Sequence, residues 1–102
     1  MWGTLSLLVL LGMAAEPDAK AAAVTRAREE LAKALEVKAD ALALEKAEAV
    51  DWPDASLGCP EPGHMYAQVI TPGYRVLLKR GDARHEVHVG AGRAVVCPRE
   101  RT

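Results

Sequence analysis

The chain has 102 residues, of which 26% are charged, and its formal net charge is −1. This length allows one domain. Residues 16–54 contain ten acidic and six basic side chains, whereas residues 55–102 contain four acidic and seven basic ones. The modestly basic second half has no tight cluster of Lys and Arg with interleaved aromatic residues, which argues against nucleic-acid binding. We interpret it as a solvated face.

The first 15 residues resemble a secretory signal peptide. They contain the apolar run Leu5–Leu11, small residues follow as far as Ala15, and the first charged side chain is Glu16. This order is typical of a signal that is cleaved, here after Ala14 or Ala15. A retained membrane anchor is the alternative, but about fourteen residues is short for a span of roughly 20. We expect an exported protein, periplasmic or secreted, with no stable membrane span after cleavage.

The rest of the chain, residues 16–102, is expected to form a single small domain that begins with an amphipathic helix. Glu16-Pro17-Asp18 places acidic residues and a proline in the first turn. Strong helix formers then continue from Ala19 to about Glu36. One apolar stripe has the spacing of a helix face: Val24, Ala27, Leu31 and Leu35.

The segment Lys38–Val50 is compatible with either a helix or a strand. Its Ala, Leu, Glu and Lys favour a helix, and neither Gly nor Pro interrupts it. However, a single helix through Val50 would be about 48 Å long at 1.5 Å per residue, which is long for so small a domain. The alternation of side chains also permits a strand, and we therefore predict a strand near Leu42–Val50.

The second half predicts β-structure. Met65–Ile70 and Tyr74–Lys79 are expected to pair as a hairpin around the turn signal Thr71-Pro72-Gly73. Two further turns, at Gly81-Asp82 and Gly90-Ala91-Gly92, delimit the expected strands Arg84–Val89 and Arg93–Cys97. The predicted fold class is α+β, with the N-terminal helix packed on a four- or five-stranded antiparallel meander sheet.

The two cysteines, Cys59 and Cys97, both lie outside the signal. In an exported protein an even cysteine count favours a disulfide. Thirty-seven residues separate them, and closing a loop of that order stabilises the fold by roughly 4 kcal/mol in the chain-entropy model. Two buried thiols or half of a metal site are the alternatives.

The segment Asp51–Tyr74 has the most distinctive composition. Its 24 residues include four prolines, three glycines, a cysteine, a tryptophan and two tyrosines, which indicates a shaped loop. The aromatic residues either pack in the core or anchor a recognition loop. The candidate binding residues are Trp52, Asp54, Ser56, Pro60, Tyr66, Gln68 and Tyr74.

Catalytic and metal-binding patterns are weak. Asp54 and Ser56 are expected to satisfy a local turn, because Ser56 lacks the context of a hydrolase nucleophile. His85 and His88 would point to opposite faces of a strand and cannot readily hold one ion, whereas Glu86 and His88 would share a face. We therefore expect no metal, no cofactor and no catalytic residue.

The central segment is similar to a family of small exported bacterial proteins of unknown function. That family has the signature W-P-D-x-S-L-G-C-P-x-P-G-x-x-Y-x-Q-x-x-x-P-G-Y-[RK]. The matching residues are Trp52-Pro53-Asp54, Ser56-Leu57-Gly58-Cys59-Pro60, Pro62-Gly63, Tyr66, Gln68 and Pro72-Gly73-Tyr74-Arg75, with Glu86, His88 and Cys97 downstream. The resemblance implies a strand before Trp52 and pairing of Cys59 with Cys97, and it implies no substrate.

Three functions follow as hypotheses. The first is a non-enzymatic exported domain that binds a protein partner in the envelope or extracellular space through the tethered loop Trp52–Pro62, with protease inhibition as one form. The second is a structural or stability module of the cell envelope whose signature residues specify only the fold. The third is a small enzyme that uses Asp54, Ser56 and His88.

Overall fold

The computed structural model describes residues 15–98, and the structural statements below refer to that part of the chain. The predicted signal peptide, residues 1–15, lies outside it except for Ala15, the first described residue of the helix. Within residues 15–98, none of the helices has both the length and the hydropathy that a membrane span requires.

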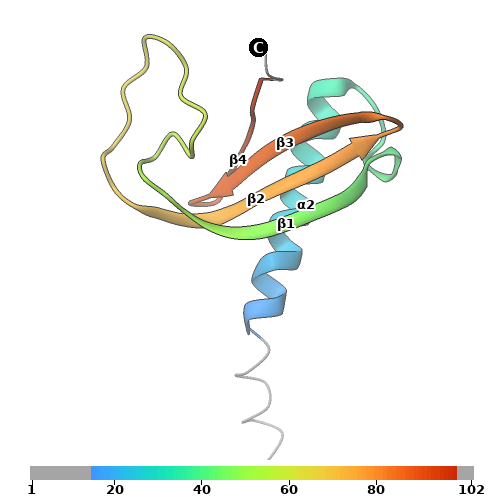
Figure 1. Ribbon diagram of the computed structural model, residues 1–102, viewed down its shortest axis with the longest axis horizontal. Helices are drawn as coiled ribbons and strands as arrows, with labels where there is room; N and C mark the ends of the chain where they lie inside the picture. Colours follow the sequence, from blue (N-terminus) through green and yellow to red (C-terminus); the bar gives the residue numbers. More distant parts are fainter. Residues whose placement is uncertain (1–14, 99–102) are drawn as a thin grey trace, which may run out of the picture.

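The domain has two layers, a helix and a four-stranded sheet (Figure 1). All neighbouring strands are antiparallel, and their order in the sheet, β1-β2-β3-β4, follows the chain. The predicted α+β meander is thus confirmed. The elements are α2 (Ala15–Leu35), the 3-10 turn η1 (Ala39–Ala41), β1 (Ala43–Trp52), β2 (Thr71–Arg80), β3 (Ala83–Gly90) and β4 (Arg93–Val96).

The main core fills the space between α2 and the sheet. The predicted helix stripe faces it: Ala27 and Leu31 are fully buried, and Leu35 packs at the edge. The sheet contributes alternate residues, as a strand with one covered face should. These are Val76 and Leu78 of β2 and Val87 and Val89 of β3. The helix therefore covers one face only, and the other face is left for polar and loop residues.

The helix ends at Leu35 although neither Gly nor Pro follows it. Glu36 adopts a left-handed backbone with φ 59°. The Val37 amide donates to Ala32 O (3.1 Å), and the Glu36 amide lies 3.3 Å from Lys33 O. This pair of bonds is a Schellman motif, and the half-buried Val37 supplies its hydrophobic contact. The chain then reverses through η1 into β1, which confirms the predicted strand.

The predicted hairpin of Met65–Ile70 with Tyr74–Lys79 is wrong. Residues 61–70 form a loop, and β2 begins at Thr71 and pairs with β1 on one side and β3 on the other. Because β2 already has two partners, the Met65–Ile70 segment has no free edge of β2 to pair with. The expected turn at Thr71-Pro72-Gly73 is therefore the first part of a strand.

Proline and glycine are accommodated in β2 by their position. Pro72 pairs only with Asp51 of β1 and lies beyond the end of the β3 ladder, where its missing N–H costs no bond to β3. At Gly73 a Cβ would lie 1.8 Å from Val89 O, so the close approach of β2 and β3 requires glycine. The other predicted turns are confirmed: two-residue loops after Arg80 and Gly90 connect β2 to β3 and β3 to β4.

The cap at Glu36 generates a stability prediction. A left-handed backbone costs an L-residue about 1–2 kcal/mol and costs glycine almost nothing. We expect Glu36→Gly to raise the free energy of unfolding, measured in urea, by up to about 1 kcal/mol. The gain is smaller than the full cost of the left-handed backbone because glycine has more conformational freedom in the unfolded chain. The matched control is Glu29→Gly inside α2, which should lower it by about 1 kcal/mol. A lower free energy of unfolding for Glu36→Gly would contradict the assignment of a strained Schellman cap at Glu36.

Candidate functional site

A second, smaller core lies on the sheet face away from α2, at the end where β1 leaves the sheet. There the rings of Trp52 and His88 are stacked, with their centroids 4.2 Å apart. Trp52 is 4% exposed and donates its Nε1–H to Val89 O (3.1 Å). Leu57 from the loop is fully buried beside them. Trp52, a candidate binding residue, is thus a core residue that anchors the loop.

Two glycines permit this packing. A Cβ at Gly58 would lie 2.9 Å from Trp52 Cζ3, and one at Gly90 would lie 2.9 Å from Leu57 Cδ2. Both contacts are closer than real Cβ atoms show, so larger residues would separate the loop from the sheet. Gly58, which belongs to the predicted signature, and Gly90, which does not, therefore both serve close packing here.

Leu57 has an unusual backbone for its residue type. Leu57 and Gly58 both have positive φ (59° and 79°), and the Cys59 amide donates to Ser56 O (3.2 Å) across them. The left-handed conformation costs leucine about 1–2 kcal/mol. Full burial of its side chain contributes about 1.5–3 kcal/mol. Burial therefore outweighs the strain, and the turn places Cys59 next to His88.

The buried ring of His88 is held at both nitrogens. Nδ1 lies 2.5 Å from Leu57 O, and Nε2 lies 2.5 Å from Glu86 Oε2. Both partners are acceptors, so a ring with a proton on each nitrogen is the form that donates to both while Glu86 is ionised. The predicted proximity of Glu86 and His88 on one face is therefore observed.

A row of alternating charges continues from this pair across the sheet. Arg75 Nη1 lies 2.8 Å from Glu48 Oε2, and Lys46 Nζ lies 3.1 Å from Glu48 Oε1. The hydrogen bond and charge of Lys46, followed by those of Arg75, lower the pKa of Glu48 below its ordinary 4.5. Arg75 Nε is 3.2 Å from Glu86 Oε2, close enough for an ion pair but without hydrogen-bond geometry.

The disulfide joins the loop to the end of β4. Cys59 and Cys97 have Cα atoms 5.6 Å apart, and both are half-buried. They line a groove of about 560 Å³ together with His88, Glu86 and Arg84. Pro60, another candidate binding residue, forms part of the same wall. Cys59 Sγ lies 3.0 Å from His88 Nδ1.

Asp54 and Ser56 form a closed turn. Asp54 Oδ1 accepts both the Ser56 hydroxyl (2.6 Å) and the Ser56 amide (2.9 Å). These two bonds lower the pKa of Asp54 below its ordinary 3.8, and the bond from the hydroxyl has the larger effect. The structure does not bring Ser56 and His88 together as a nucleophile and base: the Ser56 hydroxyl donates to Asp54, and both His88 nitrogens have the partners described above.

Residues 60–70, which we call the outer loop, are held in shape by local bonds. His64 N donates to Glu61 O (3.1 Å) across Pro62 and Gly63, and Gly63 has φ 84°, as in a type II turn. The Tyr66 hydroxyl accepts the Glu61 amide (3.1 Å) and closes this turn. Gln68, by contrast, is exposed and its side-chain nitrogen lies 3.5 Å from Tyr66 O.

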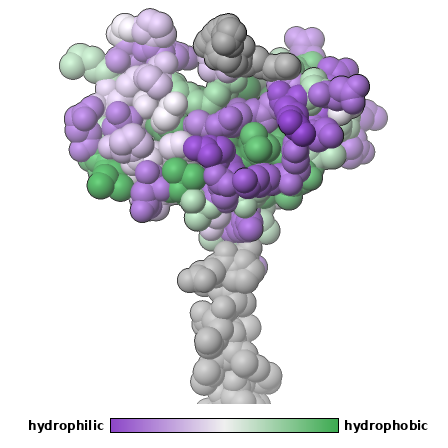
Figure 2. Space-filling view, viewed as in Figure 1, coloured by the Kyte–Doolittle hydropathy of each residue, from purple (hydrophilic) through white to green (hydrophobic). Residues whose placement is uncertain are grey.

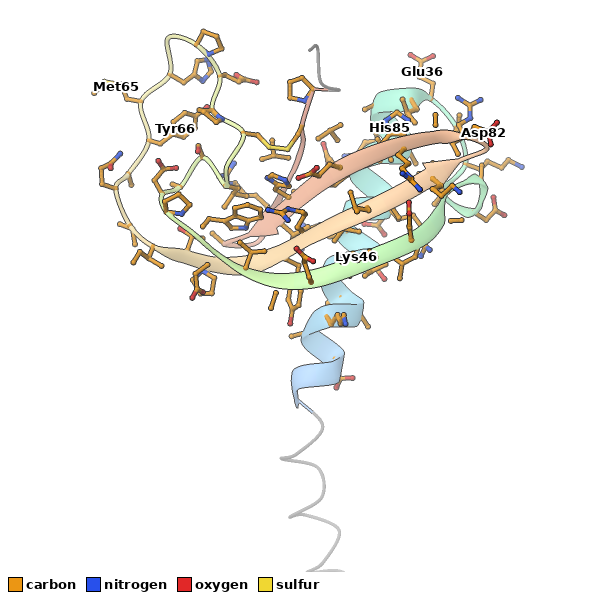
Figure 3. The ribbon with its side chains drawn as sticks, viewed as in Figure 1. Glu36, Lys46, Met65, Tyr66, Asp82 and His85 are labelled. Atoms are coloured by element: carbon orange, nitrogen blue, oxygen red, sulfur yellow. A yellow bond between two sulfur atoms is a disulfide. The ribbon has the colours of Figure 1, made fainter. Side chains whose placement is uncertain are left out.

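The outer loop also exposes apolar side chains. Met65 is 96% exposed, Ile70 69% and Val69 59%. Figure 3 shows the Met65 side chain pointing away from the body of the protein and Tyr66 turned into the loop. Hydrophilic residues cover most of the same face in Figure 2, with hydrophobic residues at the outer edge of the loop region. The outer loop therefore presents apolar surface to solvent on a braced backbone.

The predicted binding residues thus divide into three groups. Trp52 and Ser56 are buried, and Tyr74 packs against the main core on the side of α2. Asp54 belongs to the turn below the outer loop. Only Pro60, Tyr66 and Gln68 lie on the groove or the outer loop itself.

Sequence reasoning missed the most exposed large apolar side chains, Met65, Val69 and Ile70, because it placed them in a strand. The prolines and glycines on either side of this apolar run were the available signal. They indicated that the run lies within a loop.

Comparison with known proteins places the domain in a family. The model of a protein family described as a domain of unknown function, DUF8738, matches residues 24–98. This match extends from Val24 of α2 through the disulfide to Pro98, and so includes the second core and all of the main core except Ala23. None of the curated proteins and none of the solved structures matches the chain.

The Asp54 turn predicts a specific loss of stability in acid. The pKa of Asp54 is lower in the folded protein than in the unfolded chain. The ionised carboxylate therefore stabilises the fold at pH values above the unfolded pKa, and this stabilisation is lost as the pH falls through the folded pKa. We expect Asp54→Asn, which keeps an acceptor for Ser56, to be less stable than wild type at pH 7. The difference should shrink below about pH 3.8. Urea unfolding across pH 2–7 measures it, and parallel curves for the two proteins would contradict it.

Proposed function

This chain belongs to the DUF8738 family, and we propose that it is a small exported, non-enzymatic module that binds a protein through the outer loop. In this proposal Met65 enters an apolar pocket of an envelope or extracellular partner. The observation that carries it is the exposure of Met65, 96%, at a position where the backbone on both sides is hydrogen-bonded.

The brace around Met65 supports binding. On its N-terminal side the His64 amide is bonded to Glu61 O, and on its C-terminal side Ala67 O accepts the Ala55 amide (3.0 Å). The loop is also covalently attached at Cys59. A segment that is ordered before binding loses less conformational entropy when its partner arrives, so more of the contact energy becomes affinity.

Protease inhibition is the form of binding that this geometry favours. An exposed loop segment whose most exposed large apolar side chain is Met65 fits the substrate cleft of a protease with an apolar specificity pocket. If the bond after Met65 were cut, the bond from the Glu61 amide to the Tyr66 hydroxyl would keep the new ends close together. Ends held in this way favour rejoining over release.

Met65→Glu tests the proposal. Because the side chain is almost fully exposed, the melting temperature should change little. If Met65 is a hot spot of about 2 kcal/mol, the affinity of the variant should fall at least about 30-fold. The affinity is measured as inhibition of proteases with apolar specificity, or as retention of a partner from culture medium and envelope extract. Leu44→Glu, at the other large exposed apolar residue outside the outer loop, is the matched control and should retain binding.

Two results would contradict the proposal. One is the absence of both inhibition and a retained partner with the wild-type protein. The other is equal loss with Met65→Glu and Leu44→Glu, which would indicate a general effect of surface charge. Inhibition without partner retention from extract would support the protease form specifically.

A structural module is the second candidate, and the packing of Trp52, Leu57 and Gly58 favours it, because these residues are explained by the fold alone. It predicts that replacing residues 62–69 with a Gly-Ser linker leaves the function in the cell unchanged. The binding module predicts loss of function. A deletion strain complemented with each form, with protein level and melting temperature measured, separates the two.

A further inference from the structure

The disulfide lies against a fixed polar group, the ring of His88. Cys59 Sγ is 3.0 Å from His88 Nδ1, and His88 is 5% exposed. The stack on Trp52 and the contacts with Leu57 O and Glu86 hold the ring in place. The ring therefore stays beside the sulfur when the disulfide reacts.

The charge of this group matters for the sulfur chemistry. Both nitrogens face oxygen acceptors, an arrangement that suits a ring with a proton on each nitrogen and hence a positive charge. The charged groups around it are Glu86, which it contacts, and Arg75, which lies 3.2 Å from the same Glu86 oxygen. A positive charge beside a cysteine stabilises its thiolate and makes that sulfur the better leaving group in thiol–disulfide exchange.

The sulfurs are also within reach of solvent molecules. Cys59 and Cys97 are both half-buried and line the groove of about 560 Å³. Arg84 and Pro98 lie on its walls and are exposed. Arg84 is paired with Glu45 through its Nε (3.0 Å), and a guanidinium has further N–H donors that can bind an anionic substituent. The volume of the groove and the charge of Arg84 suit a small thiol that carries a carboxylate.

We propose that Cys59–Cys97 is a redox-active disulfide that exchanges with small anionic thiols in this groove. The incoming thiolate attacks Cys97 Sγ and forms a new S–S bond there, while the Cys59–Cys97 bond breaks. Cys59 leaves as a thiolate stabilised by the His88 cation. A second thiol then attacks the mixed disulfide, releases the oxidised thiol pair and gives the protein dithiol, so two thiols supply the two electrons.

Glutathione is the probe for this exchange. The folded full chain is equilibrated with reduced and oxidised glutathione over a range of ratios, quenched with acid, alkylated and analysed by intact mass and peptide mapping. A structural disulfide resists the glutathione pool, whereas an active one equilibrates with it. We expect measurable dithiol in the folded protein, and a glutathione adduct on Cys97 rather than on Cys59.

His88→Gln measures the role of the ring. We expect the equilibrium constant for reduction by glutathione to fall at least about tenfold, which corresponds to about 30 mV. In the reduced protein, the pH midpoint for alkylation of Cys59 should move upward, which a purely structural role of His88 would not cause. His64→Gln makes the same change on the exposed outer loop and should leave both values unchanged.

Two outcomes would overturn the proposal. One is a wild-type disulfide that stays oxidised at every glutathione ratio unless denaturant is added. The other is an adduct found on Cys59 rather than Cys97. Both are measured on the wild-type chain, so they hold even if His88→Gln does not fold. Neither depends on a partner protein, which keeps the result separate from the binding tests of Met65.

Discussion

The contact between the His88 ring and the loop is the interaction on which the other features of this domain depend. His88 is fixed by Trp52 on one ring face, by Leu57 O at Nδ1 and by Glu86 at Nε2. The loop must follow the ring closely, and this closeness requires glycine at position 58 and a left-handed backbone at Leu57. The disulfide then joins the loop to β4 only about 3 Å from the same ring.

This arrangement separates rigid and exposed parts of one loop. Residues up to Cys59 are packed on the sheet, whereas the outer loop leaves it and exposes Met65, Val69 and Ile70. The rigid part provides the anchor that a binding loop needs, and the same anchor places a disulfide beside the buried ring of His88. The proposed binding and the proposed exchange chemistry therefore arise from two sides of one packing unit.

Most of the fold was predictable, because periodicity records which face of an element is buried. The helix stripe, the strand before Trp52 and the two tight turns at Gly81 and Gly90 were all predicted. The predicted strand at Met65–Ile70 was wrong, since a short apolar run is the same in a strand and in an exposed loop. The predicted hairpin needs a free edge of β2, and β1 and β3 already pair with β2 on both sides.

The sequence by itself determined the α+β class, the pairing of Glu86 with His88 on one face and the shaped nature of the Pro- and Gly-rich segment, because these follow from local spacing and backbone preference. The tertiary structure alone decided which residues of that segment are buried and which are exposed. Trp52 became a core residue and Met65 an exposed one. The physical reason is that burial here depends on contacts across 30 or more residues, such as Trp52 with Val89 and Leu57 with His88, which no local pattern encodes.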